Sequence, residues 1–160
     1  MTRLVESQDI DALYRLMTNV YASSNFMSQE FCERYPDRRA LEAQLADSIC
    51  LVAQEAQELL GYVFITANKP AKLRHTADLN MGVDKDAHGR GVGRRLLENS
   101  IAVVRETGGI EILYLHVRTD NTRAVALYER FGFERLCVLT RDTKIGDTYY
   151  DAALMRKIIG

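Results

Sequence analysis

The sequence predicts a mixed α/β domain with a central, mostly antiparallel sheet of about seven strands and about four helices. Two observations predict it. Short apolar runs rich in Val, Ile, Leu and Tyr alternate with longer amphipathic stretches, which is typical of strands interleaved with helices. The chain has 160 residues, 47% hydrophobic and 27% charged, which suits a soluble globular protein with one sizeable core. We therefore expect residues 1–160 to form a single domain.

The first part of the chain predicts a strand and two helices. Residues 4–6 form a short strand, and residues 7–11 supply the N-cap and first turn of a helix. Residues 22–28 predict a loop that either covers a substrate or only connects helices. A helical turn over 29–35 follows, and Asp37 caps a second helix. The first helix has apolar residues at spacings of three and four, namely Ile10, Leu13, Tyr14, Met17, Val20 and Tyr21.

The middle of the chain predicts three consecutive strands. Residues 49–55 and 59–66 are apolar runs joined by a short polar link, which favours an antiparallel hairpin. A turn at 68–72 follows. Residues 73–83 then form a third strand that carries polar positions.

The last part predicts a helix, a strand, a second helix and a hairpin. Gly108-Gly109 ends the first of these helices, and Asn121 is an N-cap candidate for the second. The expected elements are a helix over 92–107, a strand over 110–117, a helix over 121–130, and strands near 133–142 and 149–157.

Charge and cysteine content exclude several classes of function. The formal net charge is −1, so the composition does not predict non-specific binding to nucleic acid. No apolar run approaches the ~20 residues of a membrane span, and residues 1–10 are too charged for a secretory signal. The cysteines Cys32, Cys50 and Cys137 are scattered, lack metal-ligand spacing and fit reduced thiols. We therefore expect a cytoplasmic protein that binds no metal, nucleic acid or membrane.

Residues 80–97 form the stretch that carries chemistry, where a strand runs through a charged turn with three glycines into a helix. These glycines leave room for a ligand to reach the backbone, because glycine has no Cβ. The first helix amides, from Arg90 to Arg94, lack intrahelical partners, and the helix dipole and nearby arginines favour an anion. The spacing fits neither a Walker loop nor the Rossmann pattern. It predicts a diphosphate site, or else a turn that only caps the helix.

Two motifs in this chain have a known counterpart. The first is Gly89-Arg90-Gly91-Val92-Gly93, with His88 directly before it. The second spans residues 121–133, where an Asn opens a helix, a Tyr follows seven residues later and Gly-Phe ends the run. Both resemble motifs of the GNAT superfamily of N-acetyltransferases, whose coenzyme A loop reads Arg/Gln-x-x-Gly-x-Gly/Ala; here His88 stands at the Arg/Gln position. The element order resembles the GNAT fold over nearly the whole chain, and residues 149–155 are similar to the last strand of small-molecule and amino-acid acetyltransferases.

The resemblance implies that acetyl-CoA is the co-substrate and that no metal takes part. It implies strands at 79–83 and 112–117 that splay apart, so that the pantetheine arm pairs with a free strand edge. An amide near Met81 or Val83 then faces the thioester carbonyl as an oxyanion donor. The residues that the resemblance places at the cofactor are Met81, Val83, His88, Gly89, Arg90, Gly91, Val92, Gly93, Arg94, Asn121, Ala124 and Tyr128.

Tyr128 is the candidate acid for the leaving thiolate. A phenol with an ordinary pKa of about 10 stays protonated at neutral pH and can donate its proton. The alternative is a ring that only packs on the inner face of its helix. Asn121 binds near the cofactor arm by the same resemblance, or serves as a simple N-cap, or does both.

The general base is the least defined part of the site. The positions that the superfamily often uses fall at Ala77 and Leu79, which cannot take protons. We therefore name His75 as the first candidate and Asp78 as the second, each with a structural role as the alternative. A water chain to solvent is a further route. His116 is assigned to an ordinary strand position.

These inferences predict an N-acetyltransferase that moves an acetyl group to a primary amine of a small molecule or amino acid, by direct attack in a ternary complex. The alternatives are acetylation of a protein amino terminus or lysine, and a non-catalytic module that binds acyl-CoA. The acceptor pocket is expected between residues 23–35 and 143–148. A homodimer is suggested by analogy alone.

Overall fold

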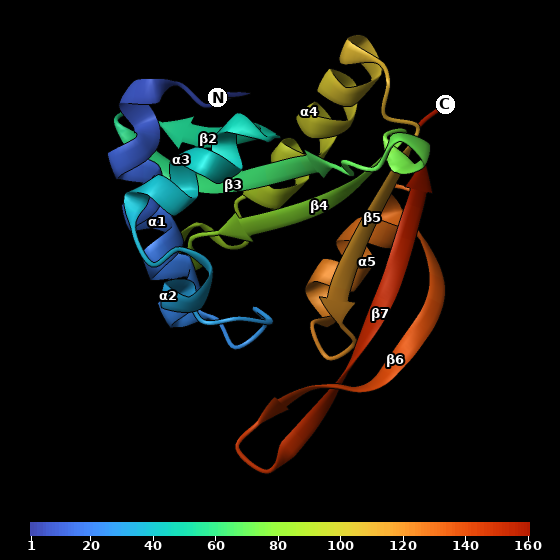
Figure 1. The fold of residues 1–160 in the computed structure, drawn as a ribbon. Helices are drawn as coiled ribbons and strands as arrows, with labels where there is room; N and C mark the ends of the chain where they lie inside the picture. The colour runs from blue at the N-terminus through green and yellow to red at the C-terminus, as the bar shows by residue number, and fades with distance from the viewer.

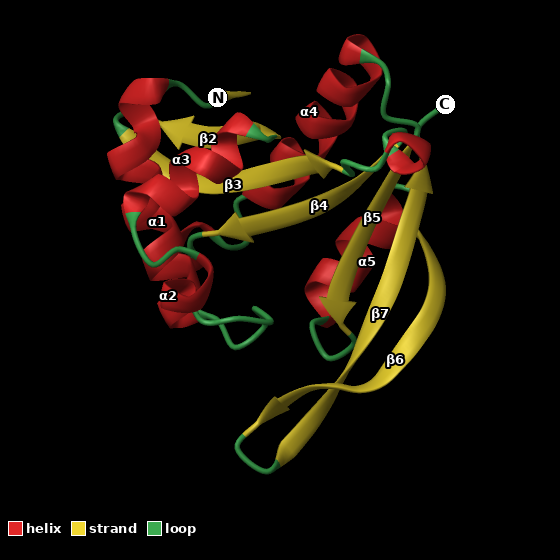
Figure 2. Ribbon diagram, viewed as in Figure 1, coloured by secondary structure: helices red, strands yellow, loops and turns green.

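A computed structural model describes all 160 residues and shows one seven-stranded sheet in the order β1-β2-β3-β4-β5-β7-β6 (Figure 1, Figure 2). Every neighbouring pair is antiparallel except β4 and β5, which are parallel. The predicted fold class is therefore confirmed. The strands are β1 (Thr2–Leu4), β2 (Ser48–Glu55), β3 (Glu58–Ala67), β4 (Thr76–Val83), β5 (Ile112–Arg118), β6 (Glu134–Ile145) and β7 (Thr148–Ile158).

Helices cover both faces of this sheet (Figure 1). On one face, α1, α2 and α3 enclose a core with Leu13, Met17 and Phe64. On the other face, α4 and α5 enclose a larger core with Leu96 and Leu113. No helix has both the length and the apolar character that crossing a membrane requires. The helices are α1 (Ile10–Ser23), α2 (Phe31–Arg34), α3 (Arg38–Ala46), α4 (Val92–Thr107) and α5 (Thr122–Arg130).

Two predicted N-caps are confirmed. The Asp37 carboxylate accepts a hydrogen bond from the Ala40 amide at 3.0 Å, at the start of α3. The Asn121 side-chain oxygen accepts one from the Ala124 amide at 3.3 Å, at the start of α5. Each cap satisfies an amide that has no partner within its own helix, and so determines where the helix begins.

Several element bounds differ from those expected. The strand expected over 4–6 ends at Leu4, because Glu6 and Asp9 form a capping box that starts a 3-10 turn. The strand expected over 73–83 begins only at Thr76, whose hydroxyl donates to the Leu73 carbonyl at 2.8 Å and closes another turn. His75 therefore lies outside the strand. The first helix runs on to Ser23, and the final strands extend to Ile145 and Ile158, so the turn between them is shorter than expected.

The sheet opens between its two parallel strands. β4 and β5 pair only from Thr76 with Ile112 to Asp78 with Tyr114, and then diverge (Figure 1). On its other side, β4 stays in unbroken register with β3 as far as Val83. The expected splaying is therefore present, and the edge of β4 that faces β5 has no strand partner beyond Asp78.

Candidate active site

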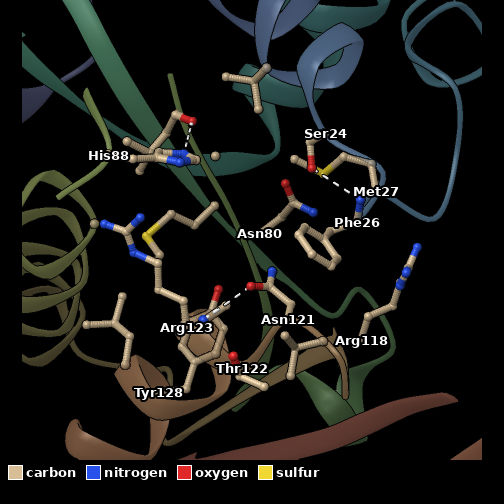
Figure 3. A pocket seen from close by; sticks show the side chains of 18 of the residues that line it. Ser24, Phe26, Met27, Asn80, His88, Arg118, Asn121, Thr122, Arg123 and Tyr128 are labelled. Atoms are coloured by element: carbon tan, nitrogen blue, oxygen red, sulfur yellow. Dashed lines mark hydrogen bonds between the residues drawn. The ribbon is translucent and has the colours of Figure 1, made fainter. Parts of the chain in front are cut away.

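A cavity of about 1060 Å³ occupies the opening between β4 and β5. We call its two regions the glycine end and the hairpin end. The glycine end comprises Gly89, Gly91, Gly93, Arg94 and Arg123. The hairpin end comprises Ser23–Ser28, Asn80, His116, Arg118, Asp142 and Tyr150. Side chains from both ends point toward the space between them (Figure 3).

The glycine end presents a row of free backbone donors. The amides of Gly89, Gly91, Val92, Gly93 and Arg94 donate no hydrogen bond within the protein, whereas the Arg90 amide donates to the Ala87 carbonyl at 3.4 Å. Gly89 and Gly91 have φ angles of +80° and +73°, a conformation that side chains disfavour. The turn therefore aims several N–H groups at one point beside the positive end of the α4 dipole, which is an arrangement that binds anions.

The arginines around this turn divide into two groups. Arg90 lies outside the cavity and is ion-paired with Glu55, which also binds Arg95 at 3.2 Å. Arg94 lines the cavity and has no carboxylate partner. Arg123 reaches across from α5, and its Nη2 lies 3.9 Å from the point that a Cβ on Gly89 would occupy (Figure 3). Arg123 is not among the site residues predicted from the sequence, although Arg123 lies two residues after Asn121, within the second motif.

His88 joins the glycine turn to the sheet. Its Nε2 donates a hydrogen bond to the Val83 carbonyl at 3.1 Å, which ties the turn to the last residue of β4 (Figure 3). Met81 and Val83 line the cavity and pack toward Gly93 of α4. A Cβ on Gly93 would lie 3.7 Å from each of these two side chains, which is ordinary van der Waals contact.

Tyr128 and Asn121 bring α5 to the cavity. Tyr128 is only 7% exposed but still lines the cavity, as do Asn121 and Ala124. Burial removes the phenol from water and raises the pKa of Tyr128 to about 12, because the anionic form loses its hydration. The phenol therefore keeps its proton throughout the neutral range.

His75 and Asp78 lie away from the cavity. The His75 carbonyl accepts hydrogen bonds from the amides of Glu111 and Ile112 at 2.7 and 3.1 Å, at the far end of β4. Asp78 is exposed, and the part of β4 that lines the cavity begins at Leu79. Neither of the two candidate bases reaches the region where Tyr128 lies.

His116 lines the cavity instead. Its neighbours Leu115 and Val117 are buried in the core beneath α4 and α5, so strand alternation turns the imidazole to the opposite face. Asn80 of β4 lies on that same face, across the opening (Figure 3). The alternation of Leu115, His116 and Val117 in the sequence indicates which face of the strand carries His116. That this face borders a cavity follows only from the divergence of β4 and β5.

Arg118 organises the hairpin end. Its Nε and Nη2 donate to the Asp120 carboxylate at 2.9 and 2.6 Å, and its Nη1 donates to the Asn25 carbonyl at 2.5 Å. The guanidinium stacks 3.6 Å from the Tyr150 ring centroid and lies 5.0 Å from that of Phe26. Hydrogen bonding to Asp120 raises the pKa of Arg118, and the same contact lowers the pKa of Asp120. One buried cation thus joins β5, β7 and the loop after α1.

A split sheet beside a helix N-terminus with free amides can bind an anion at the helix and an extended, amide-bearing ligand along the open strand edge. Comparison with known proteins names the family. The sequence model described as "Acetyltransferase (GNAT) family" matches residues 11–133. The chain belongs to this family.

Relatives and solved structures agree with the assignment. The crystal structure of a GNAT-family acetyltransferase from Streptococcus pneumoniae superimposes with a TM-score of 0.91, at 28% identity, over 100% of this chain and 99% of that one. A mycothiol acetyltransferase from Salinispora tropica is 37% identical over 91 residues, which are 56% of this chain and 30% of the relative. A ribosomal protein bS18-alanine N-acetyltransferase from Salmonella typhimurium is 40% identical over 76 residues, which are 48% of this chain and 51% of the relative. The chain therefore spans a third to a half of these two relatives.

Proposed function

We propose that this chain is an acetyl-CoA-dependent N-acetyltransferase that acts on a primary amine by direct transfer in a ternary complex. The observation that carries the proposal is the row of free amides from Gly91 to Arg94, next to an unpaired strand edge and a buried, protonated Tyr128. Anion binding, strand-like pairing and proton donation are the three capacities that the reaction asks of the protein on the co-substrate side.

The residues fit the co-substrate as follows. The free amides of the glycine turn, with Arg94 and Arg123, would hold the diphosphate. The open edge of β4 would pair with the amides of the pantetheine arm, with Asn121 and Ala124 on its other side. When bound, acetyl-CoA supplies an activated acetyl thioester. A free amide near Met81 or Val83 would stabilise negative charge on the acetyl oxygen, a contact that is typically worth about 3 kcal/mol.

Two side chains would manage protons. Tyr128 would hold a proton at its phenolic oxygen and release it to the leaving thiolate, and its raised pKa keeps that proton in place at neutral pH. His116 would accept the proton of the acceptor amine, because an imidazole nitrogen can act as a base and this one lines the hairpin end. We propose His116 in place of His75 and Asp78, which lie outside the cavity.

The acceptor has two candidate classes. A small-molecule amine is the first, and the name of the mycothiol acetyltransferase fits it. The amino terminus of a protein is the second, favoured by the 40% identical relative named for ribosomal protein alanine. Both would enter between the loop after α1 and the β6–β7 hairpin, where the cavity carries Phe26, Thr143 and Tyr150.

The test is release of free thiol from acetyl-CoA with a panel of small amines, amino acids and short peptides. Release that depends on a particular amine, with a matching acetylated product by mass spectrometry, supports the proposal. Binding of acetyl-CoA without turnover in any mixture would instead indicate a module that only binds acyl-CoA. Absence of acetyl-CoA binding would overturn the proposed function, and with it the proposal that the glycine end holds a diphosphate.

A further inference from the structure

The hairpin end contains one arginine, Arg118, and three of its five N–H groups already donate hydrogen bonds within the protein. Arg118 is the only arginine or lysine on this side of the cavity. The other arginines that line the cavity, Arg94, Arg123 and Arg130, project from α4 and α5, which pack on the opposite face of the sheet. Among the arginines and lysines that line the cavity, only Arg118 is therefore placed to bind a negatively charged group at the hairpin end.

Groups of the protein surround most of the Arg118 guanidinium. Asp120 takes the paired edge of the guanidinium, Nε and Nη2, which is the geometry that best binds a carboxylate. The Asn25 carbonyl takes Nη1. The rings of Tyr150 and Phe26 lie beside the planar guanidinium of Arg118. Only 6% of the Arg118 side chain is exposed, so little of it remains for a ligand.

Asp120 pairs with Arg118 from a partly exposed position. Its side chain is 48% exposed, and it reaches Arg118 from two residues further along the chain, in the turn between β5 and α5. A second carboxylate, Asp142 of β6, lines the same end and has no arginine or lysine partner. Two neutral polar groups lie there as well: Asn80 faces the opening, and the Ser24 hydroxyl accepts a hydrogen bond from the Phe26 amide at 3.1 Å.

We propose that Asp120 determines acceptor specificity, because by occupying Arg118 it excludes amines that carry a carboxylate next to the reacting nitrogen. The inference rests on the proposed function and narrows its acceptor. A free amino acid would place its carboxylate among Asp120 and Asp142 with no cation available, which is unfavourable by charge and by desolvation. An amine next to a neutral amide, as in an amino-acid amide or at a peptide amino terminus, meets no such charge and finds neutral partners in Asn80 and Ser24.

The experiment compares matched acceptors that differ only in this group. Thiol release is measured with alanine, alaninamide and the dipeptide alanyl-alaninamide, and with the same series for a second side chain. The wild-type protein is expected to use each amide with kcat/KM roughly ten-fold or more above that of the free acid, since a charged group that is desolvated without a partner is destabilised. A free acid with a kcat/KM equal to that of its amide overturns the inference. This comparison uses the wild-type protein alone.

Variants then test the role of Asp120. Asp120→Asn keeps the size of the side chain and frees one edge of Arg118, so the amide-to-acid ratio is expected to fall about five-fold or more. Asp142→Asn removes an equal charge from the same end but leaves Arg118 paired with Asp120, so the ratio is expected to fall less than in Asp120→Asn. Binding of acetyl-CoA by calorimetry checks that each variant is folded.

The outcomes separate this inference from the proposed function. An unchanged ratio in Asp120→Asn, or an equal fall in Asp142→Asn, overturns the specific role of Asp120 but leaves the acetyltransferase proposal standing. No thiol release with any acceptor overturns the proposed function, and the inference with it. Preference for amides that weakens more in Asp120→Asn than in Asp142→Asn supports both.

Discussion

The ring of Tyr128 meets the ring of Phe133 edge to face, with centroids 5.7 Å apart. Both rings are buried, at the end of α5 and just beyond it. This contact restricts rotation of the phenol and keeps it beside the cavity that it lines. The same burial gives Tyr128 its raised pKa, so packing and proton chemistry have one structural origin.

Replacing Tyr128 with Phe separates these two contributions. Tyr128→Phe keeps the ring and its contact with Phe133 but removes the proton, so kcat is expected to fall ten-fold or more. Acetyl-CoA affinity is expected to change less than about two-fold, because the ring still fills its site. Steady-state kinetics and calorimetry measure the two quantities. An equal loss in both would show that the residue serves packing alone.

The raised pKa of Tyr128 also predicts the shape of the pH profile. An acid with an ordinary phenol pKa would lose its proton from about pH 10, whereas Tyr128, at about 12, keeps it above that pH. The proton-donating form is present below the folded pKa and is lost as the pH rises through it. We therefore expect kcat to show no decline between pH 8 and pH 10. A decline in this range that Tyr128→Phe abolishes would contradict the raised pKa of Tyr128.

His116 and His75 provide a matched pair of histidines. His116→Gln removes the base proposed inside the cavity and is expected to lower kcat roughly 100-fold. His75→Gln changes a residue outside the cavity and is expected to change kcat less than two-fold. The measurement is kcat against pH for both variants. A larger loss of kcat in His75→Gln than in His116→Gln would indicate that His75 is the general base.

Arg123 and Arg90 form a similar pair for the co-substrate. Arg123→Ala removes an unpaired cation that faces Gly89, and is expected to raise the Kd for acetyl-CoA about five- to ten-fold. Arg90→Ala removes a cation already paired with Glu55 outside the cavity, and is expected to raise it less than two-fold. Titration calorimetry at two salt concentrations measures both. Equal effects would mean that only the overall charge matters.

Tyr62 carries a buried hydroxyl that has no hydrogen-bond partner in the protein. Its ring lies over Gly82, where a Cβ would come within 2.6 Å of it. Because an unpaired buried hydroxyl costs free energy, Tyr62→Phe is expected to raise the free energy of unfolding by about 1 kcal/mol. Tyr62→Leu leaves a cavity and is expected to lower it by 2 kcal/mol or more, on the scale of large core truncations. Urea denaturation measures both, and a destabilised Tyr62→Phe would point to a bound water at the hydroxyl.

Local sequence determined the parts of this protein that depend on near neighbours. Asp37 and Asn121 cap helices through amides three residues away, and the glycines before α4 open its N-terminus to an anion. Such contacts need no knowledge of the rest of the chain. The order of strands and helices followed from hydrophobic periodicity in the same way.

Only the tertiary structure decided which side chains meet in the cavity. His75 was excluded and His116 admitted by the point at which β4 and β5 diverge, although the two strands lie far apart in sequence. Arg90 pairs with Glu55 outside the cavity, and Arg118 bonds to Asn25, across sequence separations of 35 and 93 residues. These contacts depend on where the packed sheet brings distant segments together, and that information is not present in any local stretch of residues.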